Sequence, residues 1–95
     1  MQIIPLYTSV EKHIELKKGV IVLENPHGCP IHETNLYMLN SSGDMIWKAE
    51  KPAQNVLFTK MKLEEDSFIS TFTNSGQFCE IDIETGKILS SSSFS

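Results

Sequence analysis

The residues best suited to chemistry lie in one short segment, HGCPIH, which contains His27, Cys29 and His32. Imidazole and thiolate groups bind zinc and copper, and a cysteine beside a histidine can act as a nucleophile. A structural zinc site needs four ligands, and the rest of the chain adds only His13 and Cys79. We therefore expect neither a metal site nor an enzyme. We interpret His27, Cys29 and His32 as contacts for a partner or ligand, with metal binding as the less favoured alternative.

Residues 25–34 (NPHGCPIHET), which carry this segment, contain two prolines, a glycine and no hydrophobic period, so they form a long loop. Binding residues are often placed on such loops. Trp47, the only tryptophan, is a further candidate contact residue, although single aromatic residues are usually part of the core. The glycines occur singly, which excludes a glycine-rich phosphate-binding loop.

The composition of the 95 residues, with 40% hydrophobic and 21% charged, is that of one ordinary globular domain. The net charge is −4 and all eight basic residues are lysine, so we do not expect a nucleic-acid partner. Residues 1–10 lack the pattern of a secretory signal, and no segment is apolar enough to span a membrane. We expect a cytoplasmic protein in which Cys29 and Cys79 are reduced.

Short apolar segments separated by turn residues predict an all-β antiparallel meander of eight or nine strands. The continuously apolar run 20–23 predicts a strand that is covered on both faces. Residues 8–18 allow either a short helix or a strand, and the alternation around Ile14 and Leu16 favours a hairpin with 20–23. The other expected strands are residues 1–6, 36–39, 45–48, 56–63, 68–73, 78–83 and 87–90.

The chain ends in a serine-rich segment, residues 90–95, which we expect to be flexible. Phe94 is the exception in this segment, because a lone aromatic residue near a terminus can dock onto a sheet.

Two strand-turn-strand segments repeat one pattern, around turns at 41–44 and 84–87. The first contains Tyr37, Leu39, Asn40, Gly43, Ile46 and Trp47, and the second contains Ile81, Asp82, Thr85, Gly86, Lys87, Leu89 and Ser90. The pattern resembles the PQQ-type, or tryptophan-docking, β-propeller repeat, with Asn40 in place of an aspartate and Ser90 in place of the second tryptophan. The resemblance implies that the tryptophan covers the next sheet. It does not imply the cofactor or the dehydrogenase chemistry of that family, whose ligand residues have no match here.

These observations together predict a single domain, residues 1–95, with two blade-like sheets from residues 1–50 and 51–95, packed as a sandwich or open barrel. We expect a homodimer, because so small a core leaves apolar surface and strand edges to be covered. The function we favour is a non-enzymatic protein-binding module, such as a bacterial or phage immunity or inhibitor protein, that uses the 25–34 loop and a strand edge. The alternative is a small-ligand-binding protein with a groove at the dimer interface.

Overall fold

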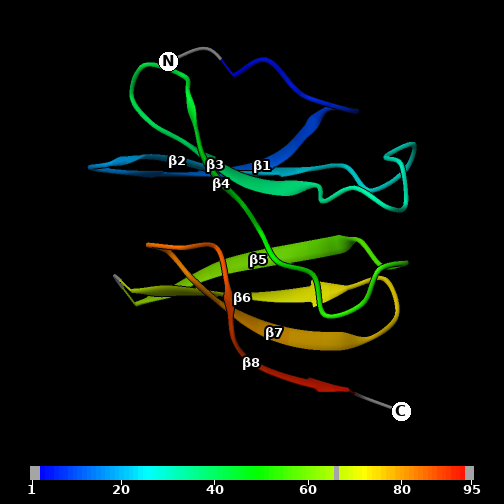
Figure 1. The fold of residues 1–95 in the computed structure, drawn as a ribbon. Coiled ribbons are helices and arrows are strands. Elements are labelled where there is room, and N and C mark those ends of the chain that lie inside the picture. The colour runs from blue at the N-terminus through cyan, green and yellow to red at the C-terminus, as the bar shows by residue number, and fades with distance from the viewer. Residues whose placement is uncertain (1–2, 66, 94–95) are drawn as a thin grey trace.

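The computed structural model describes residues 3–65 and 67–93, which form eight antiparallel strands in two four-stranded sheets (Figure 1). The first sheet contains β1 (Val10–Leu16), β2 (Gly19–Glu24), β3 (Leu36–Leu39) and β4 (Met45–Lys48) in chain order. The second contains β5 (Phe58–Glu65), β6 (Phe68–Thr73), β7 (Gln77–Asp82) and β8 (Ile88–Ser93), also in chain order. The sheets pack face to face, so the predicted all-β sandwich is confirmed.

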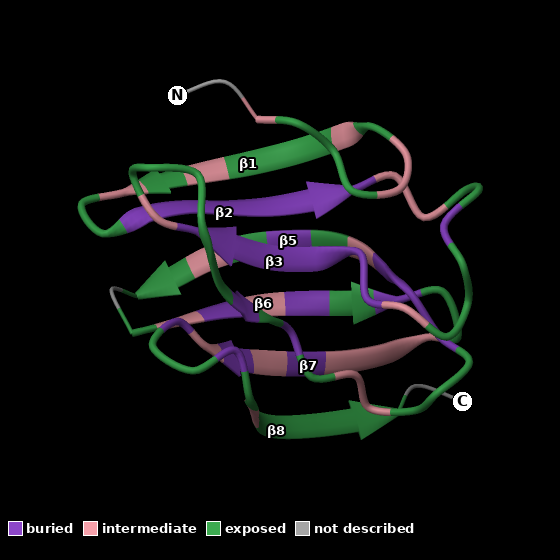
Figure 2. Cartoon of the chain, turned by 45° about the horizontal axis from the view of Figure 1, so that its top comes forward, coloured by how far each residue is buried: buried purple, intermediate pink, exposed green. Residues whose placement is uncertain are grey.

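The strand β2 is buried along its whole length, as its apolar run predicts (Figure 2). Ile21 and Leu23 belong to the core between the two sheets, whereas Val20 and Val22 belong to a second apolar cluster on the outer face of the first sheet. The preceding segment forms β1 and pairs antiparallel with β2, so the hairpin favoured over a helix is confirmed.

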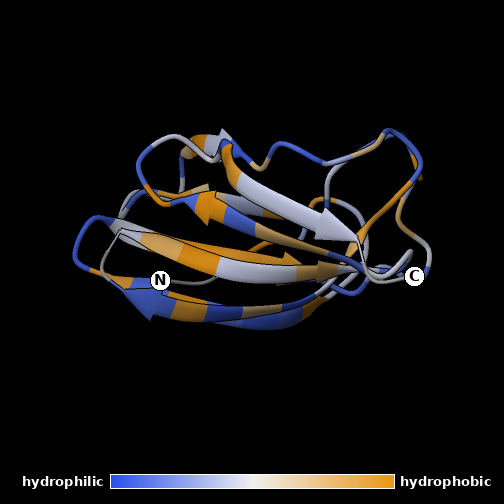
Figure 3. Ribbon diagram, turned by 90° about the horizontal axis from the view of Figure 1, so that it is seen from below, coloured by the Kyte–Doolittle hydropathy of each residue, from blue (hydrophilic) through white to orange (hydrophobic). Residues whose placement is uncertain are grey.

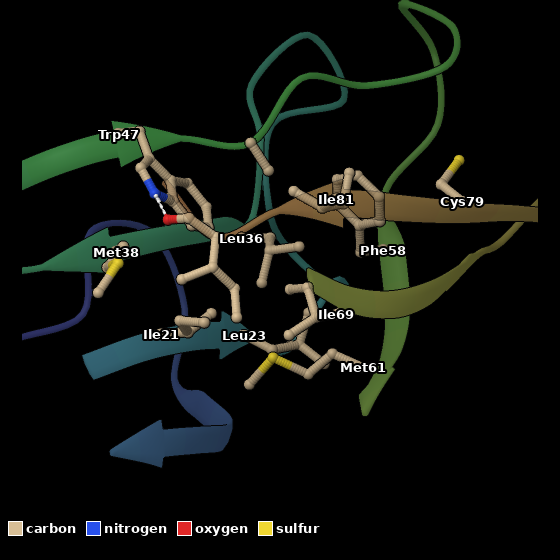
Figure 4. Close-up of a cluster of buried hydrophobic side chains, with 12 residues drawn as sticks. Ile21, Leu23, Leu36, Met38, Trp47, Phe58, Met61, Ile69, Cys79 and Ile81 are labelled. Atoms are coloured by element: carbon tan, nitrogen blue, oxygen red, sulfur yellow. Dashed lines mark hydrogen bonds between the residues drawn. The ribbon is translucent and has the colours of Figure 1, made fainter. Parts of the chain in front are cut away.

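The core between the sheets takes apolar side chains from both of them, and Figure 4 shows them interleaved. From the second sheet, Cys79, Ile81 and Ile83 point to the same side, as their alternation with Glu80 and Asp82 predicts. Both cysteines of the chain, Cys29 and Cys79, are buried and free.

Two predictions about the ends of the chain are wrong. Residues 3–6 are not a strand; they run irregularly over the outer face of the first sheet, and the backbone N–H of Leu6 donates to the buried Glu24 side chain instead of to a neighbouring strand. Ser90–Ser93 are not a flexible tail, because each pairs with a residue of β7 and so continues β8. Phe94 lies outside the described residues.

Candidate functional site

A buried carboxylate holds the N-terminal segment, residues 3–9, which we call the strap. The Glu24 oxygens accept hydrogen bonds from the backbone N–H groups of Leu6 (2.6 Å), Tyr7 (2.9 Å) and Thr8 (2.9 Å), and from the hydroxyl of Tyr37 (2.5 Å). Glu24 has no exposed surface. A buried carboxylate with this many donors anchors a segment firmly, because both of its oxygens are satisfied.

The hydrogen bonds to Glu24 also set its ionisation. Burial acts to raise the pKa of Glu24, but the bonds from Tyr37 and from the strap favour the charged form and leave the pKa lower than usual. Burial is the largest cause that raises the pKa of Tyr37, and the hydrogen bond to Glu24 and the negative charge of Glu24 raise it further. At neutral pH this site therefore holds a carboxylate bound to a neutral tyrosine.

The strap crosses the outer face of the first sheet, on the side away from the second sheet (Figure 1). A groove lies between the strap and the β3–β4 hairpin. We call it the strap groove; its volume is about 500 Å³. The groove is lined by residues of the strap, of β3 and of the hairpin turn, namely Ile4, Leu6, Tyr37, Leu39, Ser41, Ser42, Gly43, Asp44 and Met45.

The strap groove combines exposed apolar walls with a buried floor. Ile4 is 78% exposed, Leu6 45% and Met45 39%, whereas Tyr37 and Leu39 beneath them are buried. The only charged lining residue is Asp44, and no lining residue is a histidine or a cysteine. The lining therefore offers apolar side chains and one carboxylate, which can receive apolar side chains and a neighbouring cation.

The three residues of the HGCPIH segment are not brought together into one site. His27 and His32 are exposed on the surface of the 25–34 loop, while Cys29 is buried and its thiol lies 3.6 Å from the carbonyl oxygen of Pro30. Among residues 3–65 and 67–93, no three histidine, cysteine or acidic side chains are arranged to hold a metal ion.

A lysine from outside the 25–34 loop fixes its shape. The Lys51 Nζ donates to the carbonyl oxygens of Ile31 (2.8 Å), Glu33 (2.7 Å) and Gln54 (2.8 Å). Burial lowers the pKa of Lys51, and the nearby Cys29 and Glu33 act against that shift. Burial and the charges of neighbouring glutamates raise the pKa of the Cys29 thiol, so it is not an activated nucleophile.

Trp47 lies between the sheets and presents little surface to a ligand. Its side chain is 7% exposed, and its Nε1 donates to the carbonyl oxygen of Ile83, 2.7 Å away in the turn that follows β7 (Figure 4). The tryptophan therefore covers the next sheet, as expected, and its interpretation as a contact residue gives way to a structural role.

No motif in the sequence marks the residues that line the strap groove as a binding site. One feature of the sequence points to this site. Glu24 directly follows the continuously apolar run of β2, and a carboxylate buried beside such a run needs hydrogen-bond donors. The exposed Ile4 and Leu6 flank Pro5 in a segment whose sequence predicts a strand, not the wall of a groove.

Residues 1–93 match a protein family described as a domain of unknown function (DUF7957). The chain belongs to this family. The matched span includes the strap, both sheets and every residue that lines the strap groove. No curated protein and no solved structure matches the chain. The described residues contain no helix of the length and apolarity needed to cross a membrane.

Proposed function

We propose that the protein is a non-enzymatic module that binds a segment of another protein in the strap groove. The observation that supports this function is the gathering of Ile4, Leu6 and Met45, all exposed, around a buried floor. Single exposed apolar residues are common on protein surfaces, but clustered ones that line a groove are typical of interaction sites.

The charge of the groove indicates the chemistry of the partner. Asp44 is its only charged residue, and the ion pairs among the described residues, Lys18 with Glu84 and Lys62 with Glu64, do not involve it. The chain as a whole carries a net charge of −4. We expect the partner segment to place an apolar side chain in the groove and a lysine or arginine next to Asp44.

The hairpin turn allows the main chain of a partner to approach closely. Ser41, Ser42 and Gly43 carry small side chains or none, and a Cβ placed on Gly43 would have no neighbour within 4 Å. The turn is held in shape by Asn40, whose side-chain oxygen accepts from the backbone N–H groups of Ser42 and Asp44, each at 2.9 Å. A preformed wall of this kind lowers the entropic cost of binding.

A small acidic protein that covers a basic segment of its partner would act as an inhibitor or immunity protein does. Its negative charge would speed encounter with such a partner. The free Cys29 and Cys79 support a reducing, cytoplasmic location, which is part of this proposal.

Selection of random peptides displayed on phage tests the proposal directly. Peptides selected on the wild-type protein should share an apolar residue close to a lysine or arginine. Ile4→Asp should weaken their binding at least tenfold without lowering the melting temperature, because Ile4 is 78% exposed. Ile31→Asp, at a 43% exposed position on the 25–34 loop, is the matched control and should bind as wild type.

The same selection decides between the strap groove and the 25–34 loop. The loop is the second candidate surface, since Lys51 holds it rigid and Ile31 is exposed on it. Loss of binding in Ile31→Asp but not in Ile4→Asp would move the site to the loop. Selected peptides that bind both variants equally well, or a selection that yields no peptides, would overturn the proposal.

A further inference from the structure

The two sheets have four edge strands, β1, β4, β5 and β8, and three of these are protected against pairing with another chain. Natural proteins protect edges by charged side chains, by bulges and by short strands. The strand β1 carries exposed ionisable residues and a register shift, and β4 is only four residues long. The strand β5 has two register shifts and exposed charged residues, namely Lys60, Lys62, Glu64 and Glu65.

The fourth edge, β8, is six residues long, and its one register shift lies at its start, between Ile88 and Ser90. It contains no charged residue and no proline, and Ser90–Ser93 pair with β7 without a break in register. Figure 3 shows it as the pale strand of near-neutral hydropathy that leads toward the C-terminus. On its outer side no strand of the described residues pairs with it, so its backbone groups there are available to another chain.

We infer that β8 pairs with β8 of a second copy of this chain, antiparallel about a twofold axis, so that the second sheets of the two copies become continuous. An isologous contact must be complementary to itself. A strand of uncharged, small residues meets this condition, because serine faces serine and no like charges are brought together. The strap groove lies on the other sheet and takes no part in this contact.

Charges on β7 select the register of this pairing. Glu80 lies beside Ser90, whose hydroxyl donates to the Glu80 carboxylate at 2.7 Å. With Ser90 on the twofold axis, the Glu80 carboxylates of the two copies would lie in one row of the joined sheet, about three strand spacings apart, which is weakly unfavourable because the charges are screened. With Ser91 on the axis, Ser90 faces Ser92 of the second copy. Because Phe78 is the β7 partner of Ser92, the row that begins with Glu80 of one copy ends with Phe78 of the other and contains no two like charges.

Among the registers that do not align the two Glu80 carboxylates, the one centred on Ser91 pairs the largest number of β8 residues. Residues 89–93 of each copy then face one another, and Leu89, which is 57% exposed, lies opposite Ser93. Centring on Ser92 would pair only residues 91–93 within β8. Because a contact of five residues a side is smaller than a standard interface, the dimer is expected to form with increasing protein concentration.

Cysteine cross-linking tests both the contact and its register. Opposed residues of antiparallel strands have Cα atoms about 4.5–5.5 Å apart, within the range that a disulfide spans. Ser91→Cys should therefore give a covalent dimer on mild oxidation. Ser92→Cys is the matched control and should not, because its counterpart in the second copy is displaced by two residues. Cys79 is the β7 partner of Ser91 within the same copy and can form an intrachain disulfide with the new cysteine, so both variants are made in a Cys79→Ala background. Cys29 is buried and should not contribute.

Sedimentation equilibrium over a series of concentrations gives a second measurement that needs no cross-link. The wild type should change from monomer to dimer, and Ser91→Lys, which places two lysines together at the axis, should remain a monomer. A wild type that is monomeric at all concentrations, or a dimer that persists in Ser91→Lys, would overturn the proposal. So would equal cross-linking of Ser91→Cys and Ser92→Cys.

Discussion

The indole ring of Trp47 lies directly against Gly86 in the turn between β7 and β8, so closely that a Cβ on Gly86 would come within 2.6 Å of two ring carbons. The same turn is bound by the chain that follows β4: the Glu50 N–H donates to the carbonyl oxygen of Gly86 (2.8 Å), and the Glu50 carboxylate accepts from the N–H of Ile88 (2.9 Å). The end of the first sheet is thus fastened to the last hairpin of the second.

Substitution of Gly86 should therefore be costly. Gly86→Ala introduces the clash with Trp47 at a residue whose φ is +74°, and we expect a loss of roughly 2–5 kcal/mol in the free energy of unfolding. Gly43→Ala, at φ +88° with no neighbour within 4 Å of the added Cβ, is the control and should lose only about 1–2 kcal/mol. Urea unfolding measures both. Equal losses would mean that contact with the indole ring contributes nothing.

A buried amide is expected to be equally important where the sheets meet. Asn35 has no exposed surface; its side-chain oxygen accepts from the Phe58 N–H (2.9 Å), and its amide nitrogen donates to the carbonyl oxygens of Glu24 and Phe58, each at 2.7 Å. Asn35→Asp replaces the donor with an acceptor that faces two carbonyl groups.

We expect Asn35→Asp to lower the free energy of unfolding by at least about 3 kcal/mol, since buried polar groups are left without partners. The turn residue Asn40 is a matched control, because its side chain also bonds to backbone groups but these bonds are exposed to water. Asn40→Asp keeps the accepting oxygen and should cost well under about 1 kcal/mol. If Asn35→Asp proved as stable as Asn40→Asp, the bridge between the sheets would not depend on this amide.

The attachment of the strap should depend on pH. The pKa of Glu24 is lowered in the folded protein, so its contribution to stability is complete above the unfolded value of 4.5 and is lost as the pH falls through the folded-state pKa. Glu24→Gln should be less stable than wild type at neutral pH, and the difference should narrow in acid. The exposed Glu15→Gln is the control. A stability difference between Glu24→Gln and wild type that did not change with pH would contradict this account.

Loss of the hydrogen bonds from Lys51 to the 25–34 loop should make the Cys29 thiol more reactive. Lys51→Met removes two hydrogen bonds to carbonyl groups of the loop, those of Ile31 and Glu33, and loosens the cover over this thiol. We expect the alkylation rate of Cys29 in the native protein to rise about tenfold, which corresponds to about 1.4 kcal/mol of local opening. Cys79, fully buried in the other sheet, is an internal control measured in the same mass spectrum. A rise in both rates would indicate global destabilisation.

Much of the strand content could be predicted because it depends on neighbours in the chain. The limits of β3 and β6 agree with the apolar segments at 36–39 and 68–73, and Gly43, Gly76 and Gly86 all have positive φ in turns. The burial of β2 on both faces also followed from its composition. In each case the period and the turn residues were sufficient.

The candidate site could not be predicted in the same way. His27, Cys29 and His32 are adjacent in sequence, but the backbone of their loop turns the histidines outward and the thiol inward. The walls of the strap groove come from two segments, Ile4 and Leu6 in the strap and Met45 in the hairpin, that only the folded sheet brings together.

What the sequence determined by itself is local: alternation of apolar and polar residues sets the strands, and glycines set the turns, because both depend on the conformation of a few adjacent residues. The tertiary structure alone decided the course of the strap and of Ser90–Ser93. The strap is not the expected strand, because the carboxylate of Glu24, distant in sequence, accepts hydrogen bonds from its backbone N–H groups. Ser90–Ser93 form part of β8 because they pair with the edge of β7. Hydrogen bonds between distant residues outweigh local preference at such places, and they exist only once the sheets have formed.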